Sequence, residues 1–440
     1  MELANIAKCL LLGVVILWIQ IHGNKCCFEE ERLALLDFKA FVGSNGFDAD
    51  HLLPSWIDDP TSNCCKWERV MCNSTIDHVT ELSLNNTRQY DIGSDSFYYD
   101  ENSWYVNLSM FQQLKELKTL NLSYNNFDCS IDDQGFERLK KLDINGNRFN
   151  KNILSSLGAL TSLNTLTLSH MYDAMDSSFP IQDFQRLEEL DLSGNRFNNS
   201  ILLSLAALPS LNTLILNDNY MEGSFPNQGH VTELSLNNTR QYDMESYSFY
   251  YDENIWYVNL SMFQQLKELK TLNLSYNHFD CSIDDQGCER LLKVKKLEVL
   301  DLTSNRFSNI ILSSLGALIS LKTLILSSNR MEGSFPIQGF QKLEELDISL
   351  NSFNNSILSS LTVLPSLKTL ILISNLMEGS FPNQGFERLK KLDISRNRFN
   401  KNILPSLRAL ISLNALILSG MYDAMDGSFP IQELKNSNNL

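Results

Sequence analysis

The chain has 440 residues, a formal net charge of −16 and 43% hydrophobic residues. This length suits several ordinary domains or one long array of repeats. The negative charge leaves no basic stripe to neutralise phosphates, which argues against nucleic acid as a partner.

The first predicted element is a secretory signal peptide at residues 1–23. Lys8 precedes an apolar run from Cys9 to Ile21, and polar residues follow, as is usual for such a signal. The run is short for a membrane span, which needs about 20 apolar residues, and an uncleaved anchor is the alternative. No later segment is apolar over such a length, so we expect no membrane span in this chain.

Cysteines cluster in the segment that follows, for which we predict an N-terminal cap over residues 24–76. Export to an oxidising compartment makes disulfides plausible there. One of the nine cysteines lies in the signal, and the clustering indicates a stapled N-terminal module rather than a network through the whole chain. The cap holds Cys26, Cys27, Cys64, Cys65 and Cys72, whereas Cys129, Cys281 and Cys288 are scattered.

From about residue 79 one pattern dominates, L-x-x-L-x-L-x-x-N-x-F/M, as in LKTLNLSYNNF from Leu117. Asn305, Asn329, Asn351 and Asn375 of this pattern are spaced by 24, 22 and 24 residues. Such a period with this motif is the leucine-rich-repeat signature. It predicts an α/β repeat solenoid over residues 77–432, with about 13–14 repeats, built as a leucine-rich-repeat horseshoe with a parallel concave β-sheet.

The spacing has a physical reason. In a short L-x-L strand both leucines point inward and the residues between them point out. The asparagine follows at the turn, where its amide can bond backbone groups that the bend leaves unpaired. The expected asparagine ladder is Asn125, Asn147, Asn195, Asn219, Asn277, Asn305, Asn329, Asn351, Asn375 and Asn397.

Residues 78–135 recur almost unchanged at 230–287. A solenoid tolerates such a duplicated block because each coil needs only a compatible neighbour, although the junction predicts a short, strained coil near 229–239. Each copy carries an irregular aromatic insert, near 87–116 and 239–268. An insert could be a recognition island, or an oversized coil whose aromatic side chains fold back onto the convex side, which we favour.

The segment from Cys27 to Cys72 begins CFEEERLALL, continues through PSW and ends CCKWERVMC. Together with MEGSFP from Met221, Met331 and Met377, it resembles the plant leucine-rich-repeat receptor-like proteins. That resemblance implies a disulfide-stapled cap in which Cys27 pairs with Cys64 and Cys65 with Cys72, and it leaves Cys26 without a counterpart. Apolar residues between them suggest an amphipathic helix covering the first coil, namely Leu33, Leu35, Leu36 and Phe38.

Members of that family have ligand-recognising ectodomains, one membrane span and a short tail, and they signal through partner kinases, often in defence. This chain ends at residues 433–440 without a closing cap, a span or a tail. We therefore expect an ectodomain that stops before the C-terminal cap and the membrane span.

Nothing in the sequence predicts catalysis, a cofactor or a metal site. The six histidines are scattered, and no metalloprotease, P-loop or nucleophile-elbow motif is present. Outward aspartates about 10 Å apart could in isolation resemble an inverting glycosidase pair. An open column lacks the pocket that would separate their pKa values, so we favour ordinary exposed strand positions. The residues concerned are Asp143, Asp191, Asp301, Asp347 and Asp393.

Several N-x-S/T sequons are expected to carry glycans in an exported chain. Asn121 and Asn273 fall on the concave face, where a sugar would block the surface, so a ligand should prefer the coils from Leu297 to Arg398. The sequons begin at Asn73, Asn85, Asn107, Asn121, Asn198, Asn237, Asn259, Asn273 and Asn354.

The leading functional hypothesis is a secreted or plasma-membrane recognition module that binds a peptide, glycan or protein on its concave face, with a receptor kinase or adaptor as partner. Alternatives are a soluble inhibitor of a secreted cell-wall-degrading enzyme, or a non-functional truncated receptor. Alternating acidic and apolar positions suit a peptide with basic and apolar residues. The candidate contacts are Asp301, Thr303, Ile325, Ser327, Asp347, Ile371, Ile373, Asp393 and Arg396.

Overall fold

The structure is a computed structural model in which the chain forms two compact units, Met1–Leu190 and Asp191–Leu440. The predicted signal, Cys26, Cys281, Cys288, the Asn259 sequon and the C-terminal segment lie outside the described residues. The structure describes residues 27–88, 90–91, 96–97, 103–130, 136–148, 157–158, 160–171, 184–195, 197–198, 200–219, 221, 230–239, 256–257, 263, 265–277, 279–280, 294–336, 339–382, 384–399 and 403–420.

Unit 1 begins with the cap, which consists of α2 (Glu29–Ser44), α3 (Ala49–Leu52), η1 (Cys64–Lys66) and β1 (Val70–Cys72). Two disulfides staple it, and they are the pairs that the family resemblance implied. One joins residues 27 and 64, and the other joins residues 65 and 72. These covalent links add to the stability of a cap that also buries apolar side chains such as Phe38 and Trp56.

Helix α2 covers the first coil, as the apolar pattern predicted. Leu35 and Phe38 are fully buried, and the Phe38 ring lies 5.7 Å from that of Phe111 in η2 (Leu108–Phe111). The prediction was wrong for Leu33, which is 47% exposed, whereas Leu36 is half-buried. Residues two positions apart point to nearly opposite sides of a helix, so Leu33 faces solvent when Leu35 faces the core.

A buried carboxylate joins the cap to the first strand. Glu31 accepts a hydrogen bond from the backbone N–H of Val79, and its other oxygen lies 3.0 Å from Nδ1 of His78. Phe28 stacks on the His78 ring at 3.8 Å. Burial raises the pKa of Glu31, and the contacts with His78 and Val79 partly oppose that rise.

The repeats of unit 1 form a ladder of short strands. β1 pairs antiparallel with β2 (Val79–Ser83), and the pairs that follow among the described strands are parallel. In those pairs the central leucine of one strand lies opposite that of the next, which keeps every leucine on the buried face. The later strands are β6 (Thr119–Asn121), β8 (Lys141–Asp143) and β9 (Thr165–Thr167), and β10 (Glu189–Asp191) contains the division between the units.

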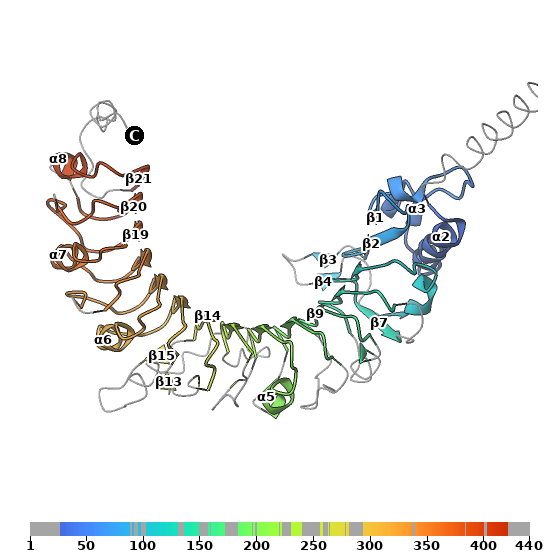
Figure 1. Cartoon of the computed structure of the whole chain (residues 1–440). Coiled ribbons are helices and arrows are strands. Elements are labelled where there is room, and N and C mark those ends of the chain that lie inside the picture. The colour runs from blue at the N-terminus through green and yellow to red at the C-terminus, as the bar shows by residue number, and fades with distance from the viewer. Residues whose placement is uncertain are drawn as a thin grey trace, which may run out of the picture. The chain divides into compact units, whose positions relative to one another are not determined.

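Unit 2 repeats the same design with a parallel ladder. Its strands follow the inner side of an arc, with helices α6, α7 and α8 on the outer side (Figure 1). The strands are β11 (Thr213–Ile215), β12 (Glu233–Ser235), β14 (Thr271–Asn273), β16 (Val299–Asp301), β17 (Thr323–Ile325), β18 (Glu345–Asp347), β19 (Thr369–Ile371), β20 (Lys391–Asp393) and β21 (Ala415–Ile417). The helices are α5 (Ser200–Leu205), α6 (Ile310–Leu315), α7 (Ser356–Leu361) and α8 (Leu404–Leu407).

The predicted asparagine ladder holds successive coils together. Asn351 Nδ2 donates to Ile348 O of its own coil at 3.1 Å and to Leu326 O of the preceding coil at 2.9 Å. Its Oδ1 accepts from Met331 N at 3.0 Å. Asn147 makes the equivalent set of bonds in unit 1 and is fully buried. Each amide therefore satisfies buried backbone groups that no strand partner reaches.

In the first aromatic insert the two alternatives stay open, because its described aromatic side chains include buried ones and Tyr105, which is 63% exposed. Trp104 is buried, its ring lies 4.8 Å from that of Phe47, and the Arg88 guanidinium lies 4.5 Å above it. Its strand β5 (Trp104–Asn107) pairs with β7 (Phe127–Ser130), and β3 (Tyr90–Asp91) pairs with β4 (Ser96–Phe97). In the second insert, β13 (Trp256–Tyr257) pairs with β15 (Phe279–Asp280) in the same way as β5 with β7.

At the duplication junction the sheet pairing is regular. Leu214 lies opposite Leu234, so this coil is 20 residues long, as hydrogen bonds across it also show. The predicted shortness is therefore present, whereas the predicted strain stays a prediction because residues 222–229 lie outside the described part. The leucine-rich-repeat solenoid, its parallel sheet and its stapled cap are confirmed.

Candidate functional site

The third residues of strands β16 to β20 in unit 2 form a column of alternating chemistry. The strand register places Asp301, Ile325, Asp347, Ile371 and Asp393 opposite one another in that order. Neighbouring strands lie about 4.8 Å apart, so acidic positions recur about every 9.6 Å with an isoleucine between them. The structure thus brings the predicted acidic and apolar positions together as one Asp/Ile column.

Each aspartate of the Asp/Ile column also closes the turn after its strand. Asp301 Oδ1 accepts from the backbone N–H of Thr303 at 2.9 Å and from its hydroxyl at 2.6 Å. Asp347 accepts from the Ser349 N–H at 2.9 Å in the same way. Within the described part of the chain, no donor reaches Oδ2 of Asp301 or Asp347. Their second oxygen is therefore available to an incoming cation.

Asp393 departs from the expectation that these positions are solvent-exposed. Only 7% of it is exposed, and its Oδ1 accepts from the N–H of Ser395 at 3.0 Å. Ile371 and Ile417 flank it on the adjacent strands, and Ser395 is itself buried against Ser419. Asp393 therefore contributes less accessible charge than Asp301 or Asp347.

The remaining candidates lie in or near a second row, just after the strands. Thr303, Ser327 and Ile373 are half-buried at equivalent positions, two residues beyond the Asp/Ile column. Arg396 is exposed but lies one residue further along its coil, at the left-handed turn position, with a φ of 54°. Arg396 is therefore adjacent to this row rather than part of it.

The two concave-face sequons lie where they were predicted. Asn121 and Asn273 are the third residues of β6 and β14, and both are half-buried. Asn273 lies directly opposite Asp301, next to the Asp/Ile column. Of the nine sequon asparagines, the eight that the structure describes are exposed or half-buried, and their glycosylation stays a prediction.

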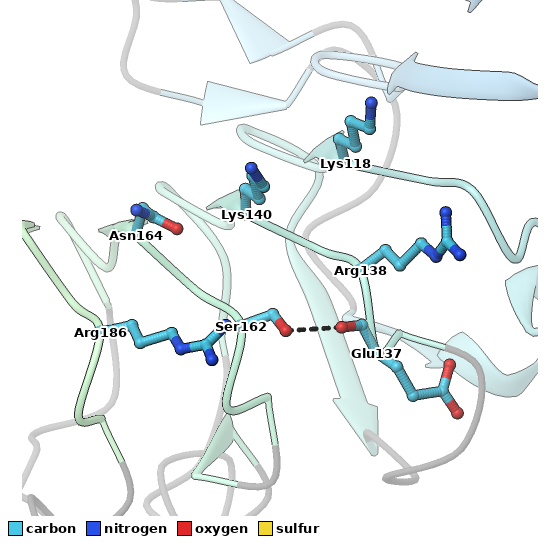
Figure 2. A pocket seen from close by; sticks show the side chains of 7 residues that line it. All are labelled: Lys118, Glu137, Arg138, Lys140, Ser162, Asn164 and Arg186. Atoms are coloured by element: carbon cyan, nitrogen blue, oxygen red, sulfur yellow. Dashed lines mark hydrogen bonds between the residues drawn. The ribbon is translucent and has the colours of Figure 1, made fainter.

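A third surface, in unit 1, was missed by the sequence reasoning. A hollow of about 390 Å³ opens on the flank from which the strands start, and we call it the basic groove. Figure 2 shows Lys118, Lys140 and Asn164 in one row, which we call the first row, with the other lining residues below it. The others are Glu137, Arg138, Ser162 and Arg186.

Backbone hydrogen bonds set the first row of the basic groove. Lys140 N donates to Lys118 O, and Asn164 N donates to Lys140 O, each at 2.8 Å. These residues directly precede strands β6, β8 and β9, so they occupy the same position in successive coils. The sequence signal of this row is the residue directly before each L-x-L strand, whereas the predicted contacts lie inside or just after the strands.

The described residues contain no group of three or more His, Cys, Asp or Glu side chains that could hold a metal ion. None of their helices combines the length and hydrophobicity that a membrane crossing requires.

Comparison with known proteins agrees with the repeat architecture. The leucine-rich-repeat N-terminal domain model matches residues 28–73, and the leucine-rich-repeat model matches residues 138–160, 186–208, 296–318 and 388–410. Two solved structures share the fold at low identity. One is an internalin of Listeria monocytogenes, with a TM-score of 0.50 and 20% identity, in which the match covers 72% of this chain and 83% of the internalin. The other is a leucine-rich-repeat protein of Leptospira interrogans, with a TM-score of 0.56 and 21% identity, in which the match covers 82% of this chain and 88% of that protein.

The sequence relatives are receptor-like proteins rather than enzymes. Receptor-like protein 14 of Arabidopsis thaliana is 40% identical over 168 residues, and Receptor like protein 21 of the same plant is 36% identical over 172 residues. In both cases the aligned part covers 36% of this chain and spans 16% of the length of the relative. The chain therefore contains leucine-rich repeats, and part of it is similar in sequence to receptor-like proteins of Arabidopsis thaliana.

Proposed function

We propose that this chain is an extracellular recognition module of a receptor-like protein, and that it binds a peptide along the Asp/Ile column. The named relatives, the two disulfides of the cap and the accessible sequons support an extracellular or plasma-membrane location. Signalling would then pass through a partner kinase or adaptor, in defence among other processes. The observation that carries the proposal is the alternation of Asp301, Ile325, Asp347 and Ile371 on consecutive strands.

The geometry selects a peptide pattern. A peptide in the polyproline II conformation rises about 3.1 Å per residue with three residues per turn, so every third side chain faces the same way at about 9.3 Å, close to the spacing of about 9.6 Å between Asp301 and Asp347. A ligand with a basic residue at every third position and apolar residues between would meet both aspartates and the isoleucines. Each ionic contact would be a charge-assisted hydrogen bond to Oδ2, the oxygen that the turn leaves available.

The test measures binding of the full chain, secreted from plant cells, to immobilised peptides. We expect peptides with lysine at every third position and leucine between to bind more tightly than peptides with lysine at every second position. Asp301→Ser and Asp347→Ser should each weaken that binding about tenfold, as the loss of one charged hydrogen bond predicts. Serine retains a turn acceptor, whereas asparagine would create a new N-x-S/T sequon at either position.

Asp143→Ser is the matched control, because Asp143 occupies the same strand position and accepts from the N–H of Asn145, but lies outside the Asp/Ile column. It should leave peptide binding unchanged. Equal loss of binding in this control, or no preference for the three-residue period, would refute the proposed site.

A further inference from the structure

The basic groove of unit 1 is a separate surface from the Asp/Ile column. It concentrates Lys118, Arg138, Lys140 and Arg186 in a chain whose net charge is −16, with Glu137 as its one lining carboxylate. We propose that the basic groove binds an acidic oligosaccharide, a chain of sugars that carry one carboxylate each.

Most of the positive charge in the groove is uncompensated. Among the residues that the structure describes, no carboxylate lies within ion-pair distance of Lys118, Lys140 or Arg186. Arg138 is the exception, since it pairs with Glu116 at 2.5 Å. Lys118 and Lys140 stand on neighbouring coils, and like charges directly opposite each other are unfavourable. A bound anion would turn this repulsion into two favourable contacts.

Unit 2 shows that the fold does not require such a column. At the same position before the strand, its coils carry Lys270, Glu298, Lys322, Glu344 and Lys368, joined by the same backbone hydrogen bonds. Their charges alternate, and Lys322 pairs with Glu298 and Lys368 with Glu344, each at 2.7 Å. Lys390 follows Lys368 in the same row, but Lys368 is already paired with Glu344. Among the described residues, it is the basic groove that holds neighbouring lysines which both lack a carboxylate partner, and an external anion could pair with them.

The lining favours a saccharide over other anions. The first-row cations repeat at the strand spacing of about 4.8 Å, which suits a polymer with one charge on each small unit. Ser162 Oγ already donates to Glu137 O, and Asn164 Nδ2 already donates to Glu188, but the hydroxyl and amide oxygens can still accept hydrogen bonds from sugar hydroxyls. None of the seven lining residues is apolar or aromatic. An acidic peptide would therefore have no anchor pocket for its side chains, and a nucleic acid would have no ring on which to stack its bases.

Calorimetric titration of the full secreted chain with an oligomer of galacturonic acid, in a buffer with a calcium chelator, tests the proposal. The neutral methyl ester of the same oligomer is the ligand control. We expect the acid to bind and the ester not to bind. Lys118→Ala and Lys140→Ala should each weaken binding about tenfold, the value of one charged contact. Both variants should fold at least as stably as the native chain, because each removes a like-charge neighbour.

Lys390→Ala is the matched protein control. Lys390 is an exposed lysine at the same position before β20, but its neighbour Lys368 is already paired with Glu344. It should bind the oligomer as the native chain does. The proposal fails if the ester binds as well as the acid, or if Lys390→Ala weakens binding as much as Lys118→Ala. Binding of poly-aspartate as tight as that of the sugar acid would assign the groove to acidic polypeptides and overturn the saccharide proposal.

Discussion

Units 1 and 2 use the same interior but differ on the flank where the strands begin. Asn147 in unit 1 and Asn351 in unit 2 make matching hydrogen bonds to their own coil and to the preceding one. One position before the strands, however, unit 1 places Lys118 beside Lys140, whereas unit 2 alternates lysine with glutamate from Lys270 to Lys368. The fold therefore dictates the buried positions, and the exposed flank is free to differ.

The difference between the two flanks distinguishes residues that stability explains from residues that it does not explain. A buried asparagine that satisfies backbone groups is explained by stability alone. A column of like charges is not explained by stability, because at the same position in unit 2 lysine and glutamate alternate and form ion pairs. Comparison between coils of one solenoid thus shows which surface residues need an explanation outside the fold.

The largest predicted effect tests whether the interiors are equivalent. Asn147→Ala and Asn351→Ala should each lower the free energy of unfolding by about 3 kcal/mol, because buried carbonyl and N–H groups lose their partners. Equilibrium urea denaturation measures both. A large loss in one variant and none in the other would show that the two interiors are not held together in the same way.

The second prediction converts the flank of unit 2 into that of unit 1. In a chain that carries Lys118→Ala and Lys140→Ala, the changes Glu298→Lys and Glu344→Lys place lysines on consecutive coils of unit 2. Affinity for the galacturonic acid oligomer should rise about tenfold or more. Thermal unfolding should shift to lower temperature in dilute buffer and recover in high salt, which screens exposed charges. Unchanged affinity would show that a lysine column alone does not bind the oligomer.

The third prediction concerns the buried carboxylate of the cap in unit 1. Burial raises the pKa of Glu31 above its ordinary value of 4.5. The contribution of Glu31 to stability is therefore complete below pH 4.5 and is lost as the pH rises through the raised value. Glu31→Gln should remove this loss and alter stability at neutral pH by less than about 1 kcal/mol. Thermal unfolding of both chains between pH 4 and 8 measures the difference, and parallel curves would contradict the assignment.

The smallest predicted effect concerns Glu344 on the flank of unit 2, whose pKa is shifted in the direction opposite to that of Glu31. The hydrogen bond from Lys368 lowers the pKa of Glu344 below 4.5. Its stabilisation is therefore present above pH 4.5 and is lost as the pH falls through the lowered value. Glu344→Gln should unfold at a slightly lower temperature than the native chain at neutral pH, and the difference should vanish in acid. A difference that persists in acid would mean that the ion pair is not its cause.

The sequence by itself determined the repeat and therefore which residues face inward. The period of 22 to 24 residues between asparagines such as Asn329, Asn351 and Asn375 predicts the short strands, their buried leucines and the turn asparagines. The reason is local, because alternation along a strand and the amide chemistry at its turn depend on only a few neighbouring residues. The two disulfides followed from the family resemblance rather than from the spacing.

Only the tertiary structure decided which residues of different coils are neighbours. Coil lengths vary, so the register had to be known before Lys118 could be placed beside Lys140, or Asp301 beside Ile325. Burial also depends on packing between coils, which covers Asp393. Interactions between coils are set by stacking, and stacking is not encoded in any single repeat.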